Sequence, residues 1–290
     1  MAVFKKATLE QSFARIAMFG PSGAGKTYGA LRMAKGLGKK IAFIDSERGT
    51  ASKYSTKFDF DVVNLEHKTI DEYVKYLSAA QEEGYDVVIV DSLTHGWAEL
   101  LDEVDKLARA KYRGNTWSAW SEGTPKQKKL VNAILDYNGH VICTMRSKTE
   151  WLQEKDEKSG KTKPVRVGLT PEQGKGIEYE FDMLIEINPE HFATVIKDRT
   201  GGDFQDVIVE KIDEKFGERI AALLGKGTER PAKVSQFVSA MRTIKSEIGD
   251  EKYFSVLKEA GYTDEDSIDK LSRDIQSTIY KALVAKKGGN

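Results

Sequence analysis

The chain has 290 residues, 40% of them hydrophobic, and its 45 basic residues are balanced by 45 acidic residues. This length is enough for one sizeable hydrophobic core and a small second domain. A single cysteine excludes a disulfide framework and fits a reducing cytosol. No apolar run approaches the roughly 18 residues of a membrane helix, so we expect a cytoplasmic protein without a membrane partner.

Short apolar runs alternate with helical patterns through most of the chain. Strands are predicted at 15–19, 40–45, 86–91 and 140–145, with two late strands at 181–187 and 192–197. Helices are predicted at 27–37, 70–83 and 126–135. The interior of 86–91 is entirely apolar, as expected of a strand that is buried on both faces. This alternation predicts an α/β fold with a mostly parallel sheet and helices on both of its faces.

The composition changes near residue 226, where a segment containing glycine and proline predicts a linker. Beyond it the pattern is helical, with helices predicted at 234–248, 252–260 and 267–285. We therefore expect an α/β domain over residues 1–225, a linker over 226–233 and a small all-helical domain over 234–290.

The loop at residues 20–27 reads Gly-Pro-Ser-Gly-Ala-Gly-Lys-Thr and matches G-x-x-x-x-G-K-[ST] at every fixed position. Its glycines allow backbone N–H groups to surround phosphate oxygens, and the following helix adds a partial positive charge. Lys26 is predicted to contact the β- and γ-phosphates, and Thr27 is predicted to bind Mg²⁺. The expected nucleotide-binding residues are Gly20, Pro21, Ser22, Gly23, Ala24, Gly25, Lys26, Thr27 and Tyr28.

Two carboxylates follow predicted strands and are candidates for the chemistry. Asp91 ends an apolar strand, where the shell of Mg²⁺ needs an anion, and Ser92 follows it directly. Glu47 lies just after the strand 40–45 and is placed to orient and deprotonate an attacking water. The spacing alone is equally compatible with a solvated glutamate in a loop.

These strands resemble those of the RecA/RadA recombinases. The sequence 41–47, Ile-Ala-Phe-Ile-Asp-Ser-Glu, resembles the strand that ends in the catalytic glutamate, and 86–92 resembles the Walker B strand. The wider pattern over residues 12–210 is similar to phage-encoded RecA-like ATPases of the Sak type, which are linked to single-strand annealing and recombination. The resemblance implies a RecA-like P-loop NTPase core that hydrolyses ATP with Mg²⁺ in the host cytoplasm. It also implies that Glu47 activates the water.

Three basic residues are assigned by the same resemblance. Arg146, after the strand 140–145, occupies the place of the γ-phosphate sensor, although the usual glutamine is absent. Lys197 and Arg199 resemble the pair that RecA-like filaments supply to the γ-phosphate of a neighbouring subunit. They imply a homo-oligomer, either a filament or a ring. The alternative is that both residues cap a strand in solvent.

The segment 106–129 combines seven basic residues and one acid with three large aromatic side chains. Cations for phosphates and aromatic rings for bases are what single-strand binders use, and the position resembles the first DNA-binding loop of RecA. Gly114, Gly123 and Pro125 predict that part of the segment is a loop. The alternative is a charged helix face with buried tryptophans. The candidate DNA contacts are Lys111, Arg113, Trp117, Trp120, Lys126, Lys128 and Lys129.

A second DNA candidate is the segment 148–176, in the position of the second RecA loop. Its predicted hairpin turn carries Lys158 and Lys161. The charges here are mixed, so a mobile surface hairpin is an equal alternative.

The leading hypothesis is an ATP-dependent recombination or annealing protein that acts on single-stranded DNA as an oligomer, with a single-strand-binding protein as a candidate partner. One alternative is a motor subunit of the helicase or packaging type. Another is a nucleotide-dependent switch that controls a protein partner, and a small-molecule kinase is a remote fourth. The helical C-terminal domain fits either a protein-interaction module or a gate for DNA.

Overall fold

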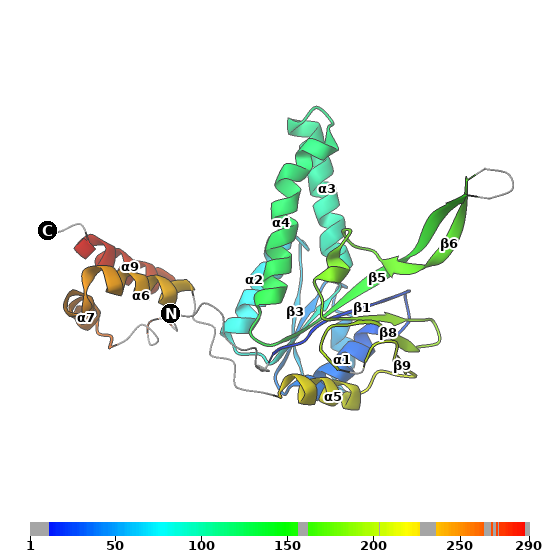
Figure 1. The fold of residues 1–290 in the computed structure, drawn as a ribbon, viewed down its shortest axis with the longest axis horizontal. Coiled ribbons are helices and arrows are strands. Elements are labelled where there is room, and N and C mark those ends of the chain that lie inside the picture. Colours follow the sequence, from blue (N-terminus) through cyan, green and yellow to red (C-terminus); the bar gives the residue numbers. More distant parts are fainter. Residues whose placement is uncertain are drawn as a thin grey trace. The chain divides into compact units, whose positions relative to one another are not determined.

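The computed structural model describes residues 12–155, 162–202, 204–226, 236–263, 268, 271 and 273–287. The chain divides into two compact units, Met1–Glu229 and Arg230–Asn290. In the described residues of the first unit, nine strands form one sheet (Figure 1). The strands are β1 (Arg15–Gly20), β2 (Ile41–Asp45), β3 (Asp61–Asn64), β4 (Val87–Asp91), β5 (His140–Lys155), β6 (Thr162–Pro171), β7 (Met183–Ile187), β8 (Ala193–Asp198) and β9 (Ile208–Val209).

The strand order is β3-β2-β4-β5-β1-β7-β8-β9, and β6 pairs only with the outer part of β5. All pairs from β3 through β1 to β7 are parallel, whereas β7–β8, β8–β9 and β5–β6 are antiparallel. The predicted mostly parallel sheet is therefore confirmed. Because parallel strands all end at one edge, β1, β2, β4 and the inner part of β5 deliver their last residues to the same place.

Helices cover both faces of the sheet, as predicted. They are α1 (Lys26–Leu37), α2 (Ile70–Glu82), α3 (Leu93–Lys111), α4 (Thr116–Asp136) and α5 (Glu214–Leu224), with short 3₁₀ turns η1 (Ala51–Tyr54) and η2 (Ile177–Tyr179). Along β4, Val87 and Ile89 pack in the core under α1 and α5, while Val88 and Val90 pack in the core under α2, α3 and α4. This alternation explains the continuous apolar run, because a strand with helices on both sides needs apolar side chains on both faces.

The loop predicted within 106–129 is confirmed only as a short turn around Gly114, and the prediction is wrong for Gly123 and Pro125. Helices α3 and α4 form a helical hairpin that projects from the sheet, joined by a turn at residues 112–115 (Figure 1). Gly123 and Pro125 both lie inside α4. Gly123 is buried, and a β-carbon there would lie 2.6 Å from a methyl group of Val104 in α3. The glycine is therefore required by the close packing of two helices, and this packing outweighs its low helix propensity.

The second unit contains α6 (Gln236–Ile248), α7 (Asp250–Glu259) and α9 (Arg273–Lys287) in its described residues. Met241, Tyr253, Leu257 and Leu283 are buried in its own hydrophobic core. The predicted all-helical character is confirmed for these residues, and the predicted start of the last helix at 267 lies outside the described residues. No helix in the described parts of the chain is both long and apolar enough to cross a membrane.

Helices α1 and α5 cross at two glycines, Gly36 and Gly217. A β-carbon on Gly36 would lie 2.0 Å from the carbonyl oxygen of Glu214, and one on Gly217 would lie 2.2 Å from the carbonyl oxygen of Met33. Neither neighbour is a flexible side chain, so the helices would have to separate. This crossing holds α1, and with it the end of the phosphate-binding loop, against the sheet.

We expect Gly217→Ala to lower the free energy of unfolding by roughly 1–3 kcal/mol, the usual effect of overpacking a core. Chemical denaturation monitored by circular dichroism would measure it. Glu218→Ala is the matched control, because its side chain is exposed on the same helix. Equal stability of Gly217→Ala and the control would contradict the close crossing.

Candidate active site

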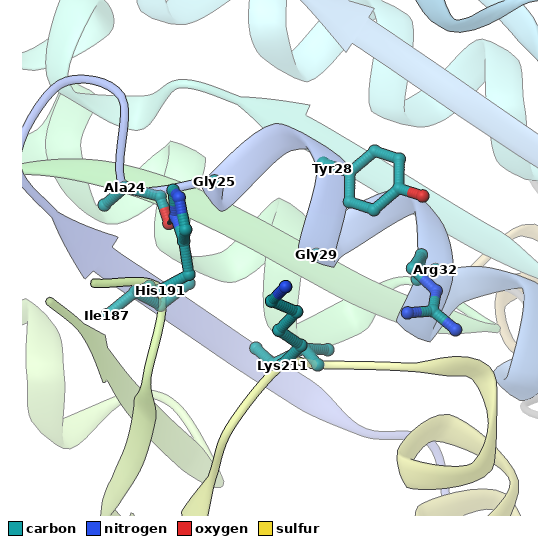
Figure 2. A pocket seen from close by; sticks show the side chains of 9 residues that line it. Ala24, Gly25, Tyr28, Gly29, Arg32, Ile187, His191 and Lys211 are labelled. Atoms are coloured by element: carbon teal, nitrogen blue, oxygen red, sulfur yellow. Dashed lines mark hydrogen bonds between the residues drawn. The ribbon is translucent and has the colours of Figure 1, made fainter. Parts of the chain in front are cut away.

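The phosphate-binding loop connects the end of β1 to the start of α1. Gly23 and Gly25 have φ values of 80° and 91°, in the left-handed region that favours glycine. Lys26 Nζ donates hydrogen bonds to the carbonyl oxygens of Gly20 at 2.9 Å and Pro21 at 2.8 Å. Burial lowers the pKa of the Lys26 ammonium, while nearby carboxylates act in the opposite direction. The second half of the loop also borders a neighbouring pocket (Figure 2).

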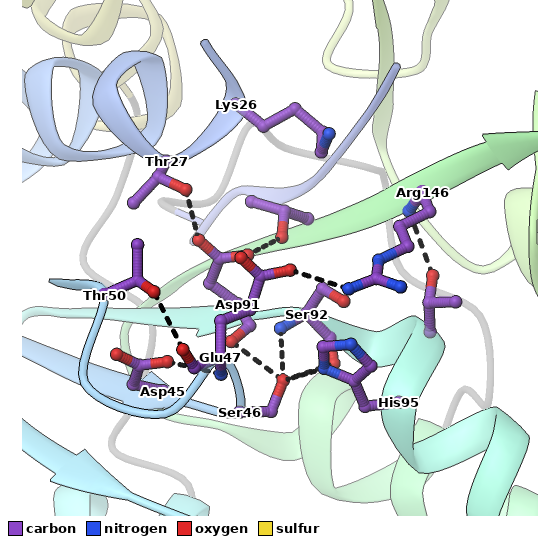
Figure 3. Close-up of polar contacts among 12 residues, drawn as sticks. Lys26, Thr27, Asp45, Ser46, Glu47, Thr50, Asp91, Ser92, His95 and Arg146 are labelled. Carbon is purple, nitrogen blue, oxygen red and sulfur yellow. Dashed lines mark hydrogen bonds and ion pairs between the residues drawn. The ribbon is translucent and has the colours of Figure 1, made fainter. Parts of the chain in front are cut away.

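The Asp91 carboxylate lies at the end of β4, beside the start of α1 (Figure 3). One oxygen accepts a hydrogen bond from the Thr27 hydroxyl at 2.5 Å, and the other accepts one from the Thr144 hydroxyl. Burial raises the pKa of the Asp91 carboxyl, and these two hydroxyl donors oppose the shift. Thr144, a fully buried residue of β5, is a member of the site that the sequence did not reveal.

The donor set at Asp91 fits Mg²⁺. A hydroxyl and a carboxylate are hard oxygen ligands, and Mg²⁺ usually combines one or two of them with water and substrate phosphates. Among the described residues, no group of three or more His, Cys, Asp or Glu side chains is arranged to hold a metal, so the remaining ligands would be phosphate and water. Within this described part, the buried Ser92 hydroxyl has no hydrogen-bond partner, which suits a metal-bound water. When bound, the ion would neutralise charge on the phosphates.

Glu47 is held beside Asp91 by the pairing of β2 with β4. Asp45 and Asp91 are register partners at the ends of these strands. The Asp45 carboxylate accepts hydrogen bonds from the backbone N–H groups of Glu47 at 2.5 Å and Ala51 at 2.9 Å. The Thr50 hydroxyl donates to the Glu47 carbonyl at 2.8 Å. The turn after β2 is therefore fixed by its own polar groups, and it presents the Glu47 side chain to the cleft.

Arg146 completes the charged groups of the cleft. It is the residue of β5 that pairs with Gly20 of β1, and its Nη2 atom lies 3.3 Å from Oε1 of Glu47. A cavity of about 450 Å³ is bounded by the phosphate-binding loop, Glu47, Asp91 and Arg146. Its lining residues are Ser22, Gly23, Gly25, Lys26, Thr27, Tyr28, Glu47, Thr50, Tyr54, Asp91 and Arg146. The structure thus brings together cations for phosphate, oxygen ligands for a metal and a carboxylate for water.

A buried polar network behind the cleft was not predicted from the sequence. The Ser46 hydroxyl lies 2.7 Å from Nδ1 of His95 and accepts a hydrogen bond from the Ser92 backbone N–H at 2.7 Å (Figure 3). The Tyr73 hydroxyl donates to the Ser92 carbonyl at 2.8 Å. Burial is the largest cause of the lowered pKa of His95, and the positive charge of Arg146 adds to it. Helix α3, which carries His95, is thereby joined to Ser46, which precedes Glu47, and through it to Ser92, which follows Asp91.

Lys197 and Arg199 do not line the nucleotide cleft. Strand β8 runs antiparallel to β7, which is parallel to β1, so β8 ends beside the start of β7 and at the edge opposite the phosphate-binding loop. Lys197 Nζ donates to the carbonyl oxygens of Glu178, Tyr179 and Phe181 at 2.7–3.0 Å. Arg199 Nη1 donates to the Tyr179 carbonyl at 2.9 Å. Neither residue serves the nucleotide site of its own chain.

The two predicted DNA-stacking tryptophans differ in environment. Trp120 stacks on Trp97 of α3 with ring centroids 5.5 Å apart and packs against the core, as the alternative of a buried tryptophan expected. Trp117, at the start of α4, is 88% exposed. Lys128 and Arg113 are exposed, while Lys158 and Lys161 lie outside the described residues.

Three of the predicted DNA-binding lysines form ion pairs within the chain. The pairs are Lys111 with Glu122, Lys126 with Glu103 and Lys129 with Asp71. All of these side chains are substantially exposed, so the pairs add little to stability. They do neutralise three of the positive charges that the helical hairpin presents.

The sheet order, the glycine loop, the Thr27–Asp91 pair and the adjacent Glu47 define a P-loop ATPase. A family model described as an AAA domain matches residues 12–230. The match covers most of the chain, so the protein belongs to this family and is a nucleotide-hydrolysing enzyme.

The comparison with solved structures finds a prototypical ATPase from the type III secretion system of pathogenic bacteria. It shares 14% sequence identity with this chain at a TM-score of 0.38, over 95% of this chain and 81% of that one. The fold assignment follows from the strand order and the family match. No curated protein matches the sequence significantly.

We expect Glu47→Gln to retain nucleotide binding and to lower kcat by about 100-fold or more, since an amide cannot accept the proton of the attacking water. Phosphate release and titration of ADP would measure the two effects separately. The exposed Glu82→Gln on α2 is the matched control. Turnover near that of the control would place the base at another residue.

Proposed function

We propose that this ATPase acts on single-stranded DNA as a homo-oligomer, in recombination or single-strand annealing of the Sak type. The observation that carries the proposal is that a basic, aromatic tip on the α3–α4 hairpin is connected through α3 to Glu47 and Arg146. Such an arrangement suits an enzyme whose hydrolysis responds to a bound strand.

The tip of the hairpin has the composition of a single-strand site. Lys106 and Arg109 lie about one turn apart near the end of α3, and Arg113 lies in the turn that follows. None of the three forms an ion pair among the described residues. Trp117 lies nearby, and its exposed ring is available for stacking on a base. Lysine and arginine for phosphates with an exposed aromatic ring for bases is a combination that tolerates any sequence. The proposal therefore keeps Arg113 and Trp117 from the predicted contacts and adds Lys106 and Arg109.

The base of the hairpin is bonded to the nucleotide site. The Thr94 hydroxyl accepts a hydrogen bond at 2.9 Å from the backbone N–H of Arg146, and His95 contacts Ser46, the neighbour of Glu47. Gln173, just after β6, donates to the Leu93 carbonyl at 2.7 Å. A displacement of α3 would therefore shift the surroundings of both Glu47 and Arg146.

The β5–β6 hairpin begins at the same point. Arg146 is the last residue of β5 that pairs with β1, and from Ser147 onward β5 pairs with β6. A strand bound along this hairpin would also act on Arg146. Release of Glu47 from Arg146 would leave its carboxylate able to accept a proton from water, which gives DNA-stimulated hydrolysis a physical route.

A second candidate function is a nucleotide-dependent switch or motor subunit that contacts a protein partner. The ion pairs of Lys111, Lys126 and Lys129 support it, because they neutralise three of the hairpin's positive charges. Measurement of ATPase activity with and without single-stranded DNA separates the two. Stimulation supports the DNA function, and an unchanged rate together with no DNA binding supports the switch.

We expect Trp117→Ala to weaken the affinity for single-stranded DNA about tenfold, since stacking is worth ~1–3 kcal/mol per base. The fold should be unaffected, because the ring is exposed. Trp120→Ala is the contrasting variant and should instead lower the melting temperature. Fluorescence anisotropy with a labelled oligonucleotide, together with thermal unfolding, would measure both. Wild-type affinity in a folded Trp117→Ala variant would remove the tip from the DNA site.

The cations of the tip should act through counterion release. Replacing Lys106, Arg109 and Arg113 with alanine should reduce the salt dependence of binding by about 2 in the log–log slope, at ~0.7 per phosphate contact. The ion-paired Lys129→Ala should change the slope less. Titrations at several salt concentrations would measure it, and equal slopes for the two variants would contradict the assignment of the tip.

The oligomer is tested through Arg199, which cannot reach its own nucleotide. If it serves a neighbouring subunit, specific activity should rise with protein concentration. A mixture of Arg199→Ala and Lys26→Ala subunits should then be more active than either variant alone, because each supplies the group that the other lacks. Failure of the mixture, with turnover independent of concentration, would show that hydrolysis is complete within one chain.

A further inference from the structure

A second pocket, of about 290 Å³, adjoins the phosphate-binding cleft and shares Gly25 and Tyr28 with it (Figure 2). It lies on the side of β1 away from Asp91, because its wall includes Ile187 at the end of β7. Its volume is near the lower end for small-ligand sites, roughly 300 Å³, and suits one ring system better than a whole nucleotide. A largely apolar pocket that shares a wall with a phosphate site has the properties needed to hold a nucleobase.

The His191 side chain in this pocket makes a hydrogen bond that determines which of its ring nitrogens carries the proton. Its backbone is in the left-handed region, with φ 73°, in a turn that is closed by hydrogen bonds to Asn188. The ring atom Nδ1 lies 3.0 Å from the carbonyl oxygen of Ala24 in the phosphate-binding loop. A carbonyl oxygen only accepts hydrogen bonds, so Nδ1 carries the proton. In the neutral imidazole Nε2 is then an acceptor.

We propose that His191 selects adenine over guanine by accepting a hydrogen bond at Nε2 from the 6-amino group of the base. Adenine carries a donor at this position, whereas guanine carries the acceptor O6. Guanine would place its acceptor O6 against the acceptor Nε2, and neither atom would receive a hydrogen bond. The inference rests on the proposed ATP-hydrolysing function and names the residue that determines its base.

The two basic side chains of the pocket, Arg32 and Lys211, do not provide this selection. Arg32 is held by Glu214, with Nε and Nη2 at 2.9 and 2.5 Å from one carboxylate oxygen. Lys211 extends into the pocket (Figure 2) and is a donor only, so it would favour O6 of guanine or the oxygens of the sugar. Of these three side chains, His191 is the one whose hydrogen bonding matches adenine, and the experiment must separate its effect from that of Lys211.

The test is isothermal titration of the full-length protein with three diphosphates: ADP, GDP and purine riboside diphosphate, which lacks the 6-amino group. The wild type should bind ADP about fivefold more tightly than purine riboside diphosphate, as expected for one net hydrogen bond, and GDP more weakly than ADP. His191→Ala should bind ADP and purine riboside diphosphate equally. His191→Asn should do the same, and asparagine tolerates the left-handed backbone, so this variant preserves the turn.

Three outcomes would overturn the proposal. They are an ADP preference that persists in both His191 variants, a preference that is lost in Lys211→Ala instead, and a wild type that binds the three diphosphates equally. The neighbouring Phe192→Ala, outside the pocket, should retain the preference and controls for changes in the turn. The titrations involve neither DNA nor hydrolysis. A missing response to single-stranded DNA would therefore contradict the proposed DNA function without affecting this result.

Discussion

The nucleotide site depends on one buried carboxylate, Asp91. A buried charge is stable only when hydrogen bonds replace the water it has lost. Two hydroxyl groups do so here, one from Thr27 at the start of α1 and one from Thr144 in β5. These bonds hold a helix and two strands in one arrangement around the place where a metal and phosphates would bind. Glu47, one strand away, and Arg146, two residues beyond Thr144, take their positions from the same arrangement.

The α3–α4 hairpin and the β5–β6 hairpin, which project from the sheet, both begin at the nucleotide site. Arg146 is the boundary between the portion of β5 inside the sheet and the portion that forms the hairpin with β6. Thr94 and His95 join the start of α3 to the backbone of Arg146 and to Ser46. Hydrogen bonds and continuous backbone therefore connect each projecting hairpin to the ion pair between Glu47 and Arg146.

The central strands and the helices α1 and α2 could be predicted closely, because each is specified by its own residues. The strand 86–91 needs apolar side chains on both faces, and α2 has Thr69 as a cap that accepts from the Glu72 backbone N–H. Other elements carry no such local signal. The edge strand β3 is mostly exposed, and its place comes from backbone pairing with β2. In α4, packing of Gly123 against Val104 outweighs the glycine and proline that predicted a loop.

By itself, the sequence determined the chemistry that a short segment can hold: the glycine loop with Lys26 and Thr27, and carboxylates at the ends of two strands. Such motifs depend on the backbone geometry of neighbouring residues, so they can be recognised before the fold is known. Only the tertiary structure decided which distant groups meet. It pairs Arg146 with Glu47, places Lys197 and Arg199 at the far edge of the sheet, and covers Trp120 while leaving Trp117 exposed. The physical reason is that these positions follow from strand order, strand direction and helix packing, which arise between segments far apart in the chain.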